Sequence, residues 1–115
     1  MAIDRRPIDQ MVLDVGAEAF QRLVLLFEDE TRGVVVALRT LLDAADWREL
    51  GRQAHSLKHA TSSFGLTGLA AIAARIEAAA DAHQPAAAGE HLAALEAAAD
   101  GELADLSRLL KTIAA

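Results

Sequence analysis

Two histidines and a lysine lie within one five-residue stretch, and their types and spacing suit phosphoryl chemistry. Lys58 follows His55 by three residues and His59 follows it by four, so a helix would place them one turn from His55. A neutral imidazole offers an unprotonated nitrogen near neutral pH and can attack a phosphoryl group covalently. Because the phosphoramidate product is anionic, Arg52, Lys58 and a protonated His59 would stabilise it.

The surrounding sequence predicts a helix that holds His55 in solvent. Over residues 46–64, apolar side chains recur at alternating intervals of three and four, which is one stripe of a 3.6-residue helix. The stripe consists of Trp47, Leu50, Ala54, Leu57, Thr61 and Phe64. His55 projects roughly 140° from the centre of this stripe, so we expect an exposed imidazole.

Both ends of this helix carry capping signals. Asp46 precedes the stripe and Glu49 follows three residues later, an aspartate version of the capping box. Gly65 follows the last stripe residue, where helices commonly end in a left-handed turn. The helix is therefore predicted with both of its limits.

The remaining stripes predict a bundle around this helix. We expect one domain over residues 1–115, with helices at about 17–44, 46–64, 67–82 and 85–113, after a short helix or lid near residues 8–13. Thr67 is the expected N-cap of the third helix, and Pro85 fits the first position of the fourth. Four narrow stripes joined by short loops can be buried only against each other. The predicted fold is all-α, an up-and-down antiparallel four-helix bundle.

The stripes also predict which residues form the core. The three remaining stripes comprise Phe20, Leu23, Phe27, Val34, Leu38 and Leu41; then Leu69, Ile72, Ala73, Ile76 and Ala80; and then Leu92, Leu95, Ala99, Leu103, Leu106, Leu110 and Ile113. In the first of these, Glu30 and Thr31 are expected to interrupt the apolar face.

Composition excludes several classes of function. A chain of 115 residues without cysteine can form a core but has neither a disulfide framework nor a thiol site. The net charge of −6 has the wrong sign for sequence-independent nucleic-acid binding. No apolar run approaches the roughly 20 residues that cross a bilayer, and the first residues lack the apolar core of a signal peptide. We expect a cytoplasmic monomer that contacts neither nucleic acid nor membrane.

The stretch from Ala54 to Gly65 resembles the signature of the histidine-containing phosphotransfer (Hpt) domain of bacterial phosphorelays. That signature reads approximately A-H-x-L-K-G-S/A-S/A-x-x-hydrophobic-G. The matching residues are Ala54, His55, Leu57, Lys58, Phe64 and Gly65, and Phe27 and Asp46-Trp47 also resemble the family. A lone exposed histidine is usually only solvated, but these matches in step argue against that interpretation.

The resemblance implies a phosphorelay intermediate rather than an enzyme. His55 would accept a phosphoryl group from a receiver-domain aspartate or a hybrid histidine kinase and pass it to a response regulator. Lys58 would stabilise the phosphate, and Glu77 would accept a hydrogen bond from Nδ1 of His55 and so orient Nε2 as the nucleophile. Alternatively, Glu77 is a solvated carboxylate paired with Arg75 or Lys58. The receiver would supply the aspartate and Mg²⁺, so no intrinsic cofactor is expected, and without a Gly-rich phosphate loop we expect no autokinase activity.

The sequence departs from the family at His59, where a glycine is usual. A small residue there lets the receiver close over the imidazole, so His59 would crowd its approach, select a receiver or add positive charge. We predict that His59→Gly accelerates transfer to a promiscuous receiver.

Gly51, Arg52 and Ser62 complete the expected partner-binding surface. Gly51 costs about 1 kcal/mol in a helix, and it either leaves room for a partner's backbone or is a tolerated surface glycine.

Two rival interpretations stay open. A degenerate module would bind a receiver without transfer and could show a change such as His59, although the intact His55 and Lys58 argue against it. His55 and His59 also have the spacing of a Zn²⁺ chelate, but a structural site needs about four ligands. No acidic residue or cysteine joins them at nearby helical spacing, and His83 and His91 lie around a distant turn.

Overall fold

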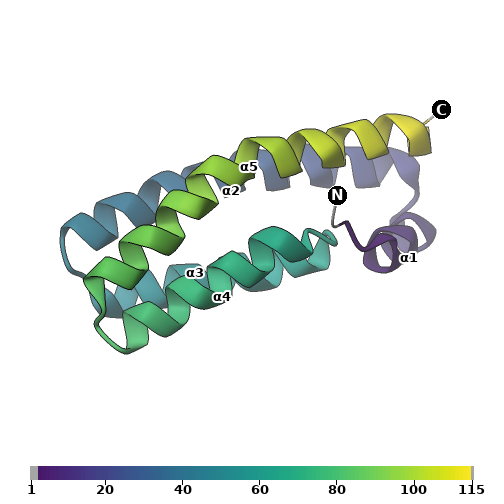
Figure 1. Ribbon diagram of the computed structural model, residues 1–115. Helices are drawn as coiled ribbons and strands as arrows, with labels where there is room; N and C mark the ends of the chain where they lie inside the picture. The colour runs from purple at the N-terminus through teal and green to yellow at the C-terminus, as the bar shows by residue number, and fades with distance from the viewer. Residues whose placement is uncertain (1–2, 115) are drawn as a thin grey trace.

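The computed structural model describes residues 3–114, which fold into five α-helices (Figure 1). The helices are α1 (Arg5–Val15), α2 (Ala17–Asp43), α3 (Trp47–Ser63), α4 (Thr67–Asp81) and α5 (Pro85–Ala114). The extended pairing among these residues is a single isolated bridge between Ile3 and Leu66. The all-α prediction is confirmed, and none of the described helices is long and apolar enough to cross a membrane.

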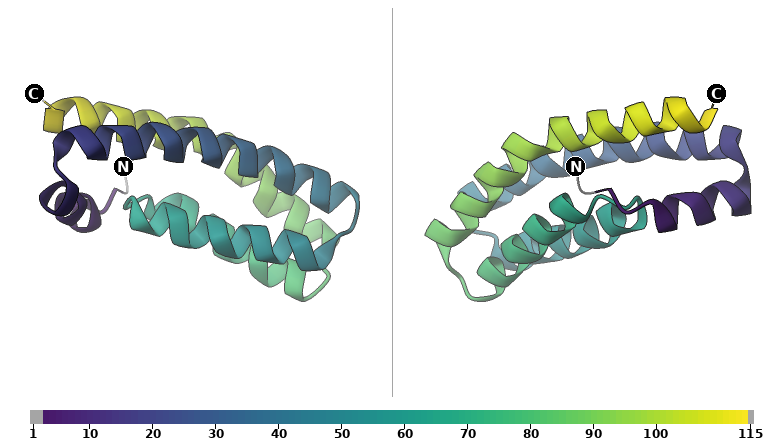
Figure 2. Two further views of the ribbon diagram at one scale, coloured as in Figure 1. Left: turned by 180° about the vertical axis from the view of Figure 1, so that it is seen from behind. Right: turned by 45° about the vertical axis from the view of Figure 1, so that its right-hand side comes forward.

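The four long helices pack around one core. α3 packs against both α2 and α4, and α5 packs against the same two helices. Figures 1 and 2 show α2 and α5 side by side in one layer and α3 and α4 in the other. Three-residue connections join α2 to α3, α3 to α4 and α4 to α5. Each helix therefore buries one stripe, which leaves an outer face of α3 free.

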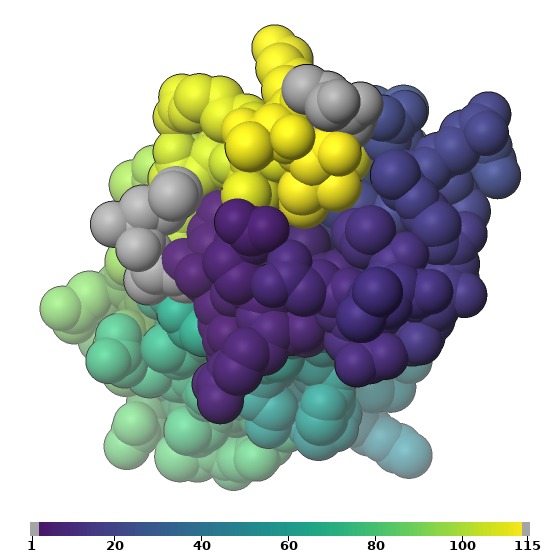
Figure 3. Space-filling view, turned by 90° about the vertical axis from the view of Figure 1, so that its right-hand side faces the viewer, coloured from purple at the N-terminus to yellow at the C-terminus, as the bar shows by residue number. Residues whose placement is uncertain are grey.

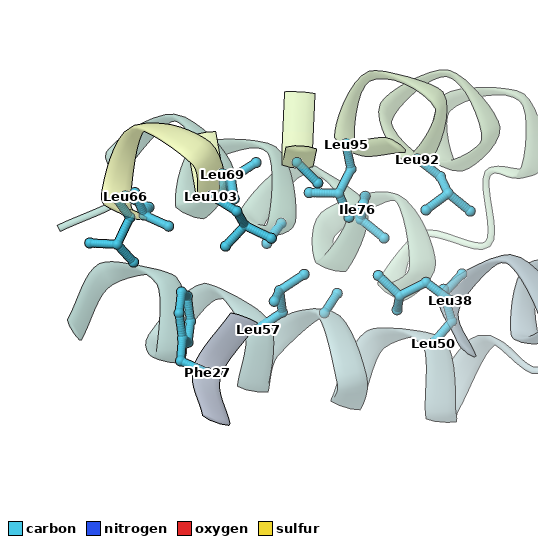
Figure 4. Close-up of a cluster of buried hydrophobic side chains, with 14 of the residues drawn as sticks. Phe27, Leu38, Leu50, Leu57, Leu66, Leu69, Ile76, Leu92, Leu95 and Leu103 are labelled. Atoms are coloured by element: carbon cyan, nitrogen blue, oxygen red, sulfur yellow. The ribbon is translucent and has the colours of Figure 1, made fainter. Parts of the chain in front are cut away.

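The core contains most of the predicted stripe residues (Figure 4). In α3, Leu50, Ala54, Leu57 and Thr61 are all buried, as predicted. The prediction for α2 was wrong at two places. Leu23 was predicted to be buried but is exposed, and its neighbour Val24 is buried in its place. Thr31 was expected to interrupt the apolar face, but it is buried as part of that face. Two adjacent apolar residues do not reveal which of them faces inward, because only the neighbouring helices decide this.

The start of α3 uses half of the predicted capping box. The Asp46 carboxylate accepts a hydrogen bond from the Glu49 amide at 3.2 Å, which confirms the cap. The reciprocal contact is not made: the Asp46 amide donates to Leu41 O, and the Glu49 carboxylate accepts from Arg52 and Gln53. Asp46 therefore fixes where α3 begins.

The start of α4 is capped from another helix. Thr67 is the first residue of α4 and not its N-cap as predicted; the N-cap position is occupied by Leu66, whose side chain cannot accept a hydrogen bond. The amide of Leu69 instead donates to the carboxylate of Glu102 from α5. Gly68 makes room for this contact, since a Cβ there would lie 2.6 Å from Oε2 of Glu102. Burial raises the pKa of Glu102, and its buried Oε1 has no hydrogen-bond partner within residues 3–114.

The N-terminal segment closes one end of the bundle, as the end-on view shows (Figure 3). α1 is longer than the predicted short helix, and its Ile8 is fully buried. Asp4 caps α1, and its amide donates to Gly65 O at 2.7 Å. Gly65 adopts the predicted left-handed turn, with φ of 72°. A Cβ on Gly65 would also lie 2.1 Å from Asp4 O, so this close approach needs glycine as well.

Candidate functional site

His55 lies near the middle of α3, on the face turned away from the core. Its side chain is 50% exposed, whereas Ala54 and Leu57 beside it are buried. These buried neighbours fix the helix against the bundle and leave the imidazole in solvent. The predicted exposure of His55 is confirmed.

A single carboxylate from α4 holds both His55 and Lys58. Oε2 of Glu77 lies 2.8 Å from Nδ1 of His55, and Oε1 of the same carboxylate lies 3.0 Å from Nζ of Lys58. The predicted orienting contact and the alternative pairing with Lys58 are therefore both present. Because α4 packs beside α3, the carboxylate reaches across the helix pair to make them.

The Glu77 contact determines which imidazole nitrogen is free. Partial burial alone would raise the pKa of Glu77, but hydrogen bonds from Lys58 and His55 outweigh it and lower the pKa. The carboxylate is therefore ionised at neutral pH and can only accept hydrogen bonds. Nδ1 of a neutral His55 must then carry the proton, which leaves a lone pair on Nε2.

Lys58 lies close enough to serve an anion bound at His55. Its side chain is 31% exposed, and its ammonium group is a donor to Glu77. An ammonium group has three donors, so Glu77 leaves others for an incoming oxygen. Lys58 and His55 lie close together, as predicted, because both contact the Glu77 carboxylate.

His59 lies directly at the free nitrogen of His55. The two Nε2 atoms are 3.1 Å apart, and the rings meet edge-to-face with centroids 4.5 Å apart. The residue that departs from the Hpt signature is thus in contact with the atom expected to react.

For the metal interpretation, the structure adds no third ligand: within residues 3–114, no group of three or more His, Cys, Asp or Glu could hold a metal ion.

Arg52 and Ser62 are exposed on α3, but Arg52 is engaged away from His55. The Arg52 guanidinium donates to Oε2 of Glu49 at 2.9 Å, and this bond lowers the pKa of Glu49 to about 2. Ser62 lies nearly two turns beyond His55, close to the end of α3. The positive charge expected from Arg52 is therefore balanced by Glu49 in this structure.

Gly51 is buried, which corrects both explanations offered for it. A Cβ at this position would lie 3.3 Å from Oδ1 of Asp81 and 3.6 Å from Cβ of Ala80, both in α4. The missing side chain lets α4 approach α3, so the glycine is neither a surface residue nor room for a partner's backbone. It contributes to the site by bringing α4, and with it Glu77, close to α3.

A groove between α2 and α3 was not predicted. It has a volume of about 150 Å³ and is lined by Phe27, Glu30, Thr31, Val34, Ser56, Leu57 and Ala60. Thr31 Oγ1 is buried there without a hydrogen-bond partner among the described residues. Ser56 directly follows His55, so the groove lies beside the site, on the flank of α3 opposite α4. The available signal was a threonine within the α2 stripe facing the small residues Ser56 and Ala60.

A family model described as the Hpt domain matches residues 22–113. The chain belongs to the Hpt family. No curated protein and no solved structure matches it. Hpt domains carry phosphoryl groups on histidine in two-component systems, in contact with receiver or kinase components, and they are carriers rather than enzymes in the usual sense. The predicted resemblance is confirmed over most of the chain.

Proposed function

We propose that His55 is the phosphoacceptor of this Hpt domain, taking a phosphoryl group on Nε2 from a receiver-domain aspartate or a hybrid histidine kinase and passing it to a response regulator. The observation that carries this proposal is the 2.8 Å contact between Glu77 and Nδ1 of the exposed His55. It leaves Nε2 as the nucleophile and points that nucleophile away from the core. Mg²⁺ and the aspartate belong to the receiver, and the domain needs no cofactor of its own.

The residues around His55 suit each part of the transfer. The Nε2 lone pair forms the N–P bond while the bond between phosphorus and the aspartate oxygen breaks, and the electron pair leaves with the aspartate carboxylate. The proton on Nδ1 stays in place, so the ring becomes cationic and the Glu77 carboxylate stabilises it. Lys58 donates to the phosphoryl oxygens. Since these residues are all in place, the geometry favours transfer over a module that only binds a receiver.

The exposed face of α3 and the adjoining groove form the receiver surface in this proposal. His59 and Ser62 lie on that face, and Arg52 at its edge can contact an acidic partner. On α2, Leu23 and Leu26 are 38% and 55% exposed and continue the helical row of Glu30, which lines the groove. The scaffold is the up-and-down antiparallel bundle, and the cytoplasmic monomer stays a prediction.

A transfer assay with a phosphorylated receiver tests the proposal. Incubation should give acid-labile label on the wild type and none on His55→Gln. His83→Gln is the matched control, because His83 lies in the turn between α4 and α5, where its ring stacks on Trp47, and should be labelled normally. ATP alone should give no label. Label retained by His55→Gln, or absent from the wild type with a competent receiver, would overturn the proposal.

A further inference from the structure

His59 contacts His55 at Nε2, the nitrogen that Glu77 leaves free. We propose that His59 is a second residue of the phosphoryl site: its Nε2–H holds the His55 lone pair at rest, and the same N–H binds a phosphoryl oxygen after transfer. This inference rests on the proposed function of His55. It is carried by two contacts on one imidazole ring: Oε2 of Glu77 lies 2.8 Å from Nδ1 of His55, and Nε2 of His59 lies 3.1 Å from Nε2 of His55.

The direction of the hydrogen bond between the rings follows from Glu77. An ionised carboxylate cannot donate, so the proton of a neutral His55 is on Nδ1 and Nε2 has none. Two bare imidazole nitrogens would repel each other at 3.1 Å. Nε2 of His59 must therefore carry the hydrogen, and His59 donates to His55. Glu77 thus fixes the tautomers of both rings.

This donated bond holds the domain in a resting state. The lone pair that would attack phosphorus is occupied, and a separation of 3.1 Å leaves no room for a phosphoryl group between the nitrogens. His59 must rotate aside before the receiver's phosphorus can reach Nε2. Because His59 is exposed, this rotation disturbs no buried packing. The residue therefore slows acceptance without blocking it.

After transfer the same donor meets a better acceptor. The phosphoryl oxygens surround Nε2, within reach of a side chain one helical turn further along α3. A hydrogen bond to a phosphoryl oxygen is charge-assisted and roughly twice as strong as one between neutral groups. Lys58 approaches from the α4 side through its bond to Glu77, and His59 approaches from the solvent side. One residue thus lowers the rate of acceptance and raises the amount of phosphohistidine at equilibrium.

Three substitutions separate these two effects in the receiver assay. His59→Ala removes both ring and donor, so initial transfer should rise a few-fold while the ratio of phosphorylated to free domain falls about tenfold. His59→Gln keeps an N–H donor and should restore that ratio to within about threefold of the wild type. His59→Phe keeps a ring without a donor and should lower the ratio without the same acceleration. An unchanged ratio in His59→Ala, or a normal ratio in His59→Phe, would overturn the inference.

Imidazole ¹⁵N NMR supplies a readout that a merely structural residue would not change. At a pH where both rings are neutral, the account predicts His55 protonated on Nδ1 and His59 protonated on Nε2. In His59→Phe, the Nε2 resonance of His55 should shift toward the value of a free lone pair. A His59 ring protonated on Nδ1 in the resting protein would contradict the inference. Labelling of His55 can succeed in either case, so this result is separable from the proposed function.

Discussion

Glu77 of α4 and Glu102 of α5 each extend a carboxylate to a neighbouring helix, and their surroundings shift the carboxyl pKa in opposite directions. Glu77 is partly exposed, contacts the side chains of His55 and Lys58, and has a lowered pKa. Glu102 lies against the first turn of α4, accepts a backbone hydrogen bond from Leu69, and has a pKa raised by burial. Both residues are glutamates, and their pKa values differ because the fold places different groups next to each carboxylate.

This difference separates a carboxylate that can take part in chemistry from one that completes the fold. The donors to Glu77 are side chains that can move and change charge, so the carboxylate responds to what happens at His55. The donor to Glu102 is an amide fixed in a helix, and the carboxylate fills the space that the neighbouring Gly68 leaves open. We therefore expect substitution of Glu77 to affect transfer and substitution of Glu102 to affect stability.

The largest effect is expected from Glu77→Ala. Loss of the carboxylate frees the tautomer of His55 and removes the stabilisation of its cationic ring, so the initial rate of transfer should fall about 10- to 100-fold. The free energy of unfolding should fall by less than about 1 kcal/mol, because the lost pairs are partly exposed. Rapid-quench measurement of labelling tests the rate. Glu96→Ala is the control: it breaks the carboxylate's contact with Arg39 between α2 and α5, and it should transfer normally.

Glu102→Ala should show the reverse pattern. The Leu69 amide loses its cap, so the free energy of unfolding should fall by about 1–2 kcal/mol, as measured by denaturant titration below pH 4.5, where the Glu102 carboxyl is protonated and its burial carries no charge. Transfer by the folded fraction should equal that of the wild type. Reduced transfer at full folding would show that the two carboxylates are not functionally separate.

The variants Lys58→Gln and Arg52→Gln compare two cationic side chains, each of which is bonded to a glutamate. Lys58 is bonded to Glu77 beside the acceptor, so its loss should lower the transfer rate about five- to tenfold. Arg52 is bonded to Glu49 and not to the carboxylate at His55, so Arg52→Gln should lower the rate by less than about twofold, through a weaker contact with the receiver. Equal losses in the two variants would mean that overall positive charge matters and that position does not.

The smallest effect is a pH dependence of opposite sign for the two glutamates. Both carboxyls have an ordinary pKa of 4.5. The lowered pKa of Glu77 gives stability that is present above this value and lost as pH falls through the folded pKa. The raised pKa of Glu102 gives stability that is present below 4.5 and lost as pH rises through its folded pKa. Unfolding of the wild type against Glu77→Gln and Glu102→Gln, from about pH 3 to pH 6, should give slopes of opposite sign. Parallel slopes would contradict the two environments.

The sequence was sufficient wherever the decisive contact is local. The α3 stripe, the Asp46 cap and the Gly65 turn each depend on residues within a few positions of one another. These signals place His55 on an exposed face, which is the main requirement of the site. Glu77 was identified through the family resemblance, since it lies 22 residues away from His55.

Predictions failed where the partner belongs to another helix. Gly51 was placed on the surface because nothing near it in sequence indicates Asp81 and Ala80 against its backbone. Thr67 is a residue type that commonly caps helices, so it was predicted as the N-cap of α4. The cap in the structure comes from Glu102 in α5, which no local signal indicates. The spacing of His55 and His59 indicated only that the two rings would be close. Whether His59 donates a hydrogen bond to Nε2 of His55 depends on the tautomer of His55, which Glu77 sets from α4.

In the proposed function, Nε2 of His55 receives the phosphoryl group. The most direct test is ¹⁵N–³¹P coupling in protein with ¹⁵N-labelled histidine, after phosphorylation by a receiver. We predict coupling to Nε2 of His55, with Nδ1 still bonded to its proton. Coupling to Nδ1 of His55, or to either nitrogen of His59, would contradict the account.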